Sequence, residues 1–409
     1  MGAELESPSQ DRPRRDRAIE HAGYNVLNLD GADVRVDLFS DVPPAVVVPP
    51  RADTRWPDAV DREPALEQLA DRLYGRRCFA TIKGRGAEVA VLAALARRGG
   101  VVVGHPLFMT LEHAIAQTGA RYELAATVDA ATADLDVAWL DDRLGKRDVW
   151  MVCVEAATNA LGGRPIRLAN LVAIHEVCRS HGVTLLLDAT RLLTNCHLLG
   201  LPILEAARAY AAAADVVSIS AAKELLVPHG GLVSCADEAV ARAAYAVGRW
   251  TGTLLEPLAL RRELARGIER VLGEPAIVAD RARQVAAMTA SLVRAGVPVL
   301  EPEGGHAAYV VLDEAALVGG GARLRALESQ LYVLTGIRTM ISKYPARRVS
   351  AMRLALAIGR YPDAVIEGIG PAVRGFLDRL GEAPALIEAD HRELRASRTR
   401  YVLTERTRC

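Results

Sequence analysis

The stretch Asp215-Val-Val-Ser-Ile-Ser-Ala-Ala-Lys223-Glu-Leu-Leu-Val-Pro-His-Gly-Gly231 joins a short apolar run to a lysine and then to a glycine pair. The run 215–219 has the length and the β-branched content of a buried strand. Upstream, another apolar run ends in Leu185-Leu-Leu-Asp188-Ala-Thr-Arg191. A carboxylate and a primary amine therefore each follow the end of a predicted strand.

Lys223 belongs to a residue type that this chain nearly lacks. Only four of the 50 basic residues are lysines, at positions 83, 146, 223 and 343. Unlike arginine, lysine readily loses a proton and forms a Schiff base. A lysine that binds an aldehyde and a carboxylate that keeps a pyridine nitrogen protonated are what a pyridoxal phosphate (PLP) enzyme needs. The alternative is a solvated surface lysine and an aspartate that caps a helix.

Composition excludes several classes of protein. The formal net charge of zero argues against a general nucleic-acid or acidic-membrane binder. No apolar stretch reaches the roughly 18 residues of a spanning helix, and the charged first residues do not form a secretion signal. The six cysteines are scattered, which indicates buried small hydrophobes rather than disulfides or metal ligands. We expect a cytoplasmic protein without a metal ion, a nucleic-acid partner or a membrane partner.

The order of predicted elements indicates an α/β fold. Amphipathic helices alternate with short apolar strands at 78–82, 101–104, 122–127, 150–155, 183–188 and 215–219. This pattern predicts a mostly parallel sheet covered on both faces. In such sheets ligands bind at the carboxyl ends of the strands, where Asp188, Ser220 and Lys223 fall.

Three regions follow from this pattern. Residues 1–60 contain many prolines and predict an N-terminal arm that lies over a partner surface. Residues 61–273 form the predicted large domain. Residues 274–409 form a smaller α+β domain with a tail, with strands at 297–301, 307–313 and 349–357 and helices at 322–335 and 363–379.

Two turns add polar groups to the same sheet edge. Lys83-Gly84-Arg85-Gly86 precedes a predicted helix, whose free N–H groups and dipole favour a phosphate, although many such turns carry glycine for packing. Ser220 adds a hydroxyl. Asn159, in Glu155-Ala-Ala-Thr-Asn159-Ala-Leu-Gly-Gly, follows a strand and could donate to a cofactor's phenolic oxygen with Arg191, or could simply occupy a left-handed turn.

As a set, these motifs resemble the tryptophanase and tyrosine phenol-lyase family, the β-eliminating lyases of PLP fold type I. Lys83-Gly-Arg-Gly-Ala-Glu88 resembles the family's phosphate turn, and Asp188-Ala-Thr-Arg191 matches outright. The segment from Asn159 to Asn170 and Ser220-Ala-Ala-Lys223-Glu, followed by the glycine pair, also resemble family motifs. The resemblance runs in order from about residue 35 to 380. It implies an aspartate aminotransferase-like large domain with a sheet of the seven-stranded type.

The resemblance also implies a role for each site residue. Lys223 would be the Schiff-base lysine and Asp188 the pyridinium partner. The implied cofactor-binding residues are Gly84, Arg85 and Ser220 at the phosphate, Phe108 stacked on the ring with His105 as a rival, and Asn159 and Arg191 at the phenolic oxygen. Arg353, in Met352-Arg353-Leu-Ala-Leu, would bind the substrate carboxylate together with Asn159. For Phe108 core packing is the alternative, and His306 is expected to be structural.

The chain departs from the family on the side of the leaving group. The family's first lysine of a pair is Ala222 here, and its phosphate-turn glutamine is Lys83. No tyrosine stands near residues 54–60, where the family has a proton donor. The cation-binding region at 41–45 shows no clear match. Around 338–342 the arginine that would recognise a phenol ring is missing.

We therefore predict a PLP-dependent lyase that acts on an amino acid by β-elimination, with a leaving group that is neither indole nor phenol. The alternatives are transamination, β-replacement or cyclisation in a specialised biosynthetic pathway, a non-enzymatic descendant of the family, and a nucleotide-binding protein, for which no glycine fingerprint exists. Fold type I sites are built between subunits, so the resemblance implies a homodimer or homotetramer.

Overall fold

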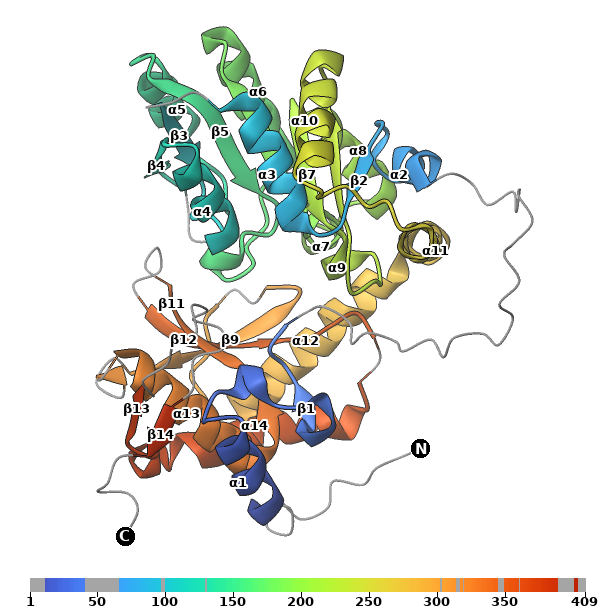
Figure 1. Cartoon of the computed structure of the whole chain (residues 1–409). Helices are drawn as coiled ribbons and strands as arrows, with labels where there is room; N and C mark the ends of the chain where they lie inside the picture. Colours follow the sequence, from blue (N-terminus) through green and yellow to red (C-terminus); the bar gives the residue numbers. More distant parts are fainter. Residues whose placement is uncertain are drawn as a thin grey trace, which may run out of the picture. The chain divides into compact units, whose positions relative to one another are not determined.

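The computed structural model describes residues 12–40, 66–96, 100–128, 131–301, 304–313, 317–318, 320–344, 349–359, 361–388 and 401–403. The chain divides into two compact units (Figure 1). The central unit is Val42–Asp280, and the terminal unit joins Met1–Asp41 to Arg281–Cys409.

A seven-stranded sheet forms the middle of the central unit. Its strand order is β2-β8-β7-β6-β5-β3-β4. In chain order the strands are β2 (Phe79–Thr81), β3 (Val101–Gly104), β4 (Arg121–Leu124), β5 (Val149–Glu155), β6 (Thr184–Asp188), β7 (Val216–Ser220) and β8 (Gly231–Cys235). Within this sheet β8 runs antiparallel to both its neighbours, and the other pairs of neighbours are parallel. The predicted mostly parallel, seven-stranded sheet is confirmed.

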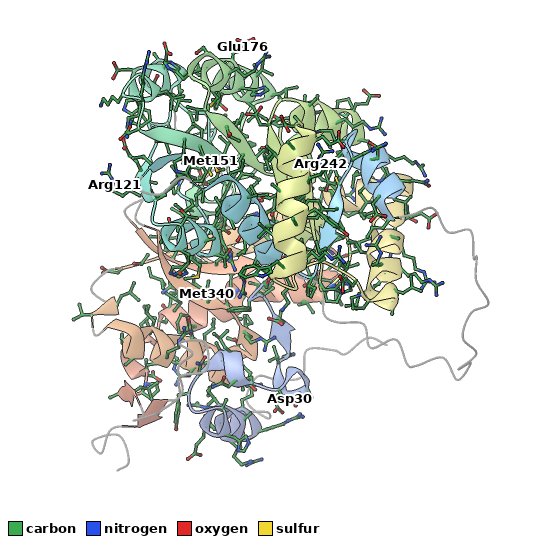
Figure 2. The ribbon with its side chains drawn as sticks, turned by 45° about the horizontal axis from the view of Figure 1, so that its top comes forward. Asp30, Arg121, Met151, Glu176, Arg242 and Met340 are labelled. Atoms are coloured by element: carbon green, nitrogen blue, oxygen red, sulfur yellow. The ribbon has the colours of Figure 1, made fainter. Side chains whose placement is uncertain are left out.

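Helices lie on both faces of this sheet (Figure 1). A core on one face unites α3 (Gly84–Leu95), α4 (Met109–Gln117) and α10 (Glu238–Trp250) with the strands. The other helices of the unit are α2 (Leu66–Tyr74), α5 (Val137–Leu144), α6 (Leu168–His181), α7 (Leu192–Leu198), α8 (Ile203–Ala212), α9 (Ala221–Glu224) and α11 (Leu258–Gly273). Every residue of β5 is buried, as expected for a strand covered on both sides. Met151 of β5 lies among the helices, whereas Glu176 of α6 and Arg242 of α10 lie on the outside (Figure 2).

The terminal unit contains a three-stranded antiparallel sheet in the order β11-β12-β9. Its strands are β9 (Ala307–Leu312), β11 (Met340–Tyr344) and β12 (Val349–Ala355), and its helices are α12 (Ala276–Arg294), α13 (Gly320–Thr335) and α14 (Asp363–Leu377). One face of β9 and β12 packs against these helices in a common core. The predicted strand at 297–301 is wrong, because only an isolated bridge joins Val299 to Val310.

The N-terminal residues 12–40 belong to the terminal unit. They form α1 (Arg12–His21), two short 3₁₀ turns (Val26–Asn28 and Gly31–Asp33) and β1 (Val36–Asp37), which pairs in parallel with β10 (Ile337–Arg338). Arg15 Nε donates to the carbonyl of Val333 (2.8 Å), and the Tyr332 hydroxyl donates to the carbonyl of Asp33 (2.7 Å). The structure thus groups the chain differently from the predicted boundaries at 60 and 273. The proline-rich part of the predicted arm, 43–57, lies outside the described residues.

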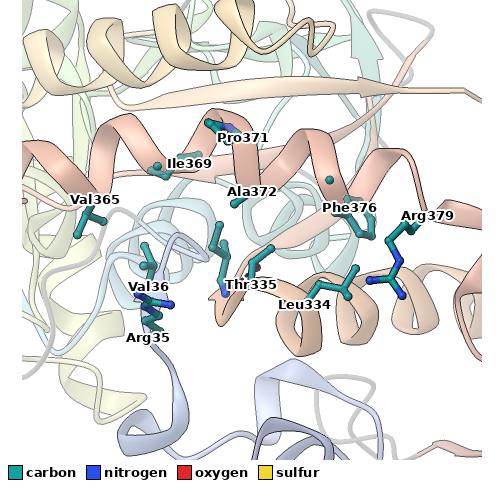
Figure 3. A pocket seen from close by; sticks show the side chains of 13 residues that line it. Arg35, Val36, Leu334, Thr335, Val365, Ile369, Pro371, Ala372, Phe376 and Arg379 are labelled. Carbon is teal, nitrogen blue, oxygen red and sulfur yellow. Dashed lines mark hydrogen bonds between the residues drawn. The ribbon is translucent and has the colours of Figure 1, made fainter. Parts of the chain in front are cut away.

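A pocket with a volume of about 440 Å³ lies in the terminal unit (Figure 3). Side chains of α13, β1 and α14 line it, and they are mostly apolar, with Arg35 and Arg379 among them. None of the predicted site residues lines this pocket. In the part of the chain that the structure describes, no helix combines the length and apolar character needed to cross a bilayer.

Candidate active site

Asp188 lies at the centre of the carboxyl edge of the sheet. It ends β6, where it is paired with Glu155 of β5 and Ser218 of β7. Its carbonyl accepts the N–H of Ala156 (2.9 Å). The ends of three neighbouring parallel strands therefore meet around this carboxylate, as the sequence predicted.

Thr190 connects Asp188 to the end of β7. Its N–H donates to Asp188 Oδ1 (2.9 Å), and its hydroxyl oxygen accepts the N–H of Ser220 (3.0 Å). Thr190 thereby fixes the direction of the Asp188 side chain. It also fixes the backbone of Ser220, the last residue of β7, relative to Asp188.

The glycine turn packs directly against Ser220. A Cβ atom on Gly84 would lie 2.6 Å from the Cβ of Ser220, so no larger residue fits at position 84 without movement. Lys83 is the N-cap residue of α3, and its side chain makes no capping hydrogen bond. The amino end of a twelve-residue helix, the Ser220 hydroxyl and the exposed Arg85 thus belong to one corner of the unit.

Lys223 follows in the single turn of α9, where it is half-buried. The orientation of this turn is set by the next residue, Glu224, which is only 3% exposed. Its carboxylate accepts the N–H groups of Leu193 (2.8 Å) and Thr194 (3.0 Å). Because Arg191 immediately precedes α7, Glu224 ties the lysine turn to the helix that begins beside Arg191.

Glu155 joins the turn that follows β3 to the turn that follows β5. Its Oε1 accepts the N–H of Phe108 (2.6 Å), and its Oε2 accepts the N–H of Asn159 (3.3 Å). Phe108 is 39% exposed at the start of α4, and Asn159 is 7% exposed. Both residues therefore lie at the same edge as Asp188, on turns that follow β3 and β5.

His105, the predicted rival of Phe108, is buried in the core of the unit. Its Nε2 donates to the carbonyl of Ala133 (2.5 Å), and its Nδ1 accepts the N–H of Glu155 (3.0 Å). Burial lowers the pKa of His105 to about 4, so the ring is neutral. These bonds give His105 a structural role between the turn after β3 and the end of β5.

Three carboxyl groups influence one another at this edge. Burial raises the pKa of Glu155 to about 8, and the charge of Asp188 adds to the shift. Burial and Asp188 likewise raise the pKa of Glu88 to about 8. The pKa of Asp188 is itself raised by burial, against the hydrogen bonds from Thr190 and the charge of Arg191. Among the described residues no such cluster has an arrangement that could hold a metal ion.

The structure brings most of the predicted residues together in the central unit: Gly84, Arg85, Phe108, Asn159, Asp188, Arg191, Ser220 and Lys223. Arg353 belongs to β12 of the terminal unit, where it is 5% exposed and its Nη2 donates to the carbonyl of Phe39 (3.1 Å). The segments 41–45 and 54–60, where the chain departs from the family, lie outside the described residues. Arg338 forms an ion pair with Asp37.

Sequence reasoning assigned no role to Glu155, Thr190 or Glu224. The sequence contains a signal for two of these three residues. Glu155 is a charged residue at the end of an otherwise apolar strand, and Glu224 directly follows the marked lysine. Thr190 gave no such signal, because its part depends on the backbone of Ser220, 30 residues away.

Comparison with known proteins identifies the family. The model of the β-eliminating lyase family matches residues 62–367. The chain belongs to the β-eliminating lyase family. It is 26% identical to a tyrosine phenol-lyase of Fusobacterium nucleatum over 373 residues, which cover 81% of this chain and 78% of the relative. A tyrosine phenol-lyase of Intrasporangium calvum is 27% identical over 394 residues, which cover 86% of this chain and 80% of the relative.

Solved structures confirm the fold class. A serine palmitoyltransferase of Sphingomonas wittichii has a TM-score of 0.61 at 16% identity and covers 90% of this chain and 85% of its own. A threonine aldolase of Leishmania major has a TM-score of 0.58 at 16% identity, covering 78% and 88%. A structure of SPT with a PLP internal aldimine has a TM-score of 0.60 at 18% identity, covering 90% and 85%. The fold is that of PLP fold type I, and the predicted cofactor is the one that the β-eliminating lyases use.

The residues of the central unit fit this cofactor. The amino end of α3 lies against Ser220 so closely that a Cβ on Gly84 would collide with it. The side chain of the N-cap residue Lys83 does not bond to this helix end, whose first backbone N–H groups suit a phosphate. Asp188 is a buried carboxylate with a raised pKa, and a positive charge beside it would offset its desolvation. Lys223 supplies a half-buried primary amine at the same edge.

Proposed function

We propose that this chain is a PLP-dependent lyase that removes a β-substituent from an amino acid and releases a 2-oxo acid and ammonia. The observation that carries the proposal is the continuous path of contacts from Asp188 through Thr190 and Ser220 to Gly84. Lys223 stands on the turn that directly follows Ser220. This path connects the groups required at the two ends of the cofactor.

PLP, when bound, supplies an aldehyde that condenses with primary amines and a protonated ring that accepts an electron pair from the substrate's α-carbon. Lys223 would hold the aldehyde, and its amine, once displaced by the substrate, would move the α-proton. Asp188 would hold the proton on the ring nitrogen. Gly84, Arg85 and Ser220 would bind the phosphate.

The other predicted residues would orient the ring and the substrate. Phe108 would cover one face of the ring, while Asn159 and Arg191 would donate to the phenolic oxygen. Arg353 would bind the substrate's carboxylate with its planar guanidinium. We infer that the leaving group is neither indole nor phenol. Residues 54–60 contain no tyrosine and residues 339–342 contain no arginine, where the resemblance implies a proton-donating tyrosine and an arginine that recognises a phenol ring.

A different PLP reaction is the second candidate. The same missing residues favour it, since they leave the cofactor side complete and change the side of the leaving group. Transamination would require a second 2-oxo acid, β-replacement would require a nucleophile, and elimination requires neither. Assays with tryptophan, tyrosine, cysteine and serine, measuring 2-oxo acid and ammonia with and without these co-substrates, separate the three reactions.

The proposal is tested by replacing Lys223 with alanine. We expect Lys223→Ala to lose turnover with every active amino acid and to hold the cofactor only loosely. Lys146→Ala, which removes an exposed lysine after α5, is the matched control and should retain both properties. Full activity in Lys223→Ala would overturn the assignment.

A further inference from the structure

We propose that Glu155 is a positioning residue that holds the ring-covering Phe108 and the oxygen-facing Asn159 in register with Asp188. This inference rests on the proposed function, because it concerns residues proposed to contact the cofactor. It assigns Glu155 to orientation of the cofactor ring rather than to proton transfer.

The first support is the geometry of the two carboxylate oxygens. Each oxygen accepts a backbone N–H from a different turn: Phe108, 47 positions earlier in the chain, and Asn159, four positions later. Phe108 directly precedes α4, and no side-chain hydrogen bond of its own caps that helix. One side chain therefore sets the spacing between two turns that are otherwise far apart in sequence.

The backbone of Glu155 strengthens the same connection. Its N–H donates to His105 Nδ1 (3.0 Å), and His105 lies on the turn that leads to Phe108. The hydroxyl of Thr158, next to Asn159, lies 3.2 Å from the same ring nitrogen. The turns after β3 and β5 are thus joined on both sides of Glu155.

The third support is the position of Glu155 relative to Asp188. The two residues are direct neighbours on β5 and β6, and Glu155 is only 4% exposed. A buried carboxyl group beside another carboxyl group is unfavourable unless specific contacts compensate. The other charged groups that act on Glu155 are Asp188, Arg191 and Glu88.

An amide cannot replace these two contacts. A carboxyl group offers an acceptor on each oxygen, whereas glutamine offers one acceptor and one NH₂ group. In Glu155→Gln the NH₂ group would face the N–H of Phe108 or of Asn159, so one of the two turns would lose its anchor at unchanged side-chain volume. Leaving a buried N–H donor without its acceptor weakens a dependent binding step by roughly tenfold or more.

The test compares Glu155→Gln with the wild-type holoenzyme and with Glu176→Gln. The control makes the same chemical change on the exposed face of α6 (Figure 2). We expect Glu155→Gln to bind PLP roughly tenfold or more weakly and to show a diminished circular-dichroism band of the bound cofactor, because the ring is held less uniquely. Glu176→Gln should match the wild type in both measurements.

The cofactor band, measured together with the melting temperature, separates orientation of the cofactor ring from general stability of the fold. A residue that only stabilised the fold would lower the melting temperature and leave the cofactor band of the folded fraction unchanged, and that result would overturn the inference. If Glu155→Gln does not fold, Glu155→Asp is used, which keeps two acceptor oxygens but shortens the side chain. We expect its cofactor band to be diminished, and a wild-type band there would contradict the inference.

Failure of the inference is distinguishable from failure of the proposed function. If the wild-type protein binds no PLP at Lys223, the proposed function fails. If the wild type binds PLP at Lys223 and Glu155→Gln has the same affinity and the same cofactor band, the inference about Glu155 alone fails.

Discussion

Side chains at the carboxyl edge of the sheet are held mainly by backbone groups of other turns. Glu224 accepts N–H groups from α7, Glu155 accepts them from two turns, and Asp188 accepts one from Thr190. Buried carboxylates with such partners keep one orientation. These backbone contacts therefore fix the directions of all three side chains at the edge.

The raised pKa values of Glu155 and Glu88 predict how stability depends on pH. Each pKa lies at about 8 in the folded protein, against an ordinary value of 4.5. Between these values the folded state binds more protons than the unfolded state, so the free energy of unfolding falls as the pH rises. The contribution is fully present below about pH 4.5 and is lost as the pH approaches 8.

The measurement is urea unfolding of the apoprotein at pH 5.5, 7 and 8, in the wild type and in Glu88→Gln. We expect the loss of stability toward pH 8 to be smaller in the variant by on the order of 1 kcal/mol, since one titrating group is gone. Identical pH slopes in the two proteins would show that Glu88 does not carry a proton in the folded state at neutral pH. His105, whose pKa is lowered, acts at the other end of the range, where stability is lost as the pH falls from about 6.5 to 4.

A single site residue could be predicted where it stands at, or shortly after, the end of an apolar strand in the sequence. Asp188 and Lys223 follow apolar strands directly, so their place at the sheet edge could be read from the sequence. The function of Glu155 could not, because it depends on the backbone of Phe108, and no local pattern shows which N–H a carboxylate will accept.

At the scale of elements, the close approach of the glycine turn to the end of β7 is a testable constraint. In Gly84→Ala the new Cβ would lie 2.6 Å from the Cβ of Ser220. Such overpacking costs about 1–3 kcal/mol and would push Ser220 away from the amino end of α3. We expect lower thermal stability together with weaker binding of PLP.

Gly375→Ala is the matched control, because Gly375 lies exposed inside α14 and an added Cβ would meet nothing within 4 Å. Alanine there should stabilise the helix by about 0.5–1 kcal/mol. If Gly84→Ala is as stable as the wild type and binds PLP equally well, the turn does not pack as described.

There is a physical reason for each element that could not be predicted correctly from the sequence. β8 begins at Gly231 and contains Ser234, so it lacks the continuous apolar run by which the neighbouring strands were recognised. β11 is an edge strand of its sheet, where polar residues are tolerated, and it contains Ser342 and Lys343. It therefore lacks the apolar run that would predict a strand. The run 297–301 is apolar but contains Pro298, which lacks the N–H needed for a regular ladder.

At the scale of the whole molecule, the grouping of residues 12–40 with the C-terminal part could not be predicted from sequence. The β1–β10 pair joins Val36 to Ile337, and contacts of such separation leave no trace in local periodicity. The sheet of the central unit was predictable because its strands and helices alternate along a continuous part of the chain.

The division into two units gives a separate spectroscopic signal for one of them. The three tryptophans that the structure describes, at positions 139, 150 and 250, belong to the central unit, and the fourth, at position 56, lies outside the described residues. Because PLP would be held by residues of this unit, a hundredfold excess of PLP over its dissociation constant should stabilise it by about 2.7 kcal/mol. We expect the tryptophan-monitored melting temperature to rise by roughly 5–10 °C, because a unit of this size gains about 2–4 °C for each kcal/mol.

Lys223→Ala is the control for this experiment, and it should show a smaller rise at the same PLP concentration because the covalent attachment is lost. A tryptophan-monitored transition that does not respond to PLP in the wild type would contradict the placement of the cofactor in the central unit.

The most direct test of the central claim is reduction of the PLP-loaded protein with borohydride, followed by peptide mapping. The chain contains only four lysines, at 83, 146, 223 and 343, so the result is unambiguous. We expect a pyridoxyl label on the peptide that contains Lys223 and none on the other three lysines. A label at Lys83, Lys146 or Lys343 in place of Lys223, or no label on any lysine, would contradict it.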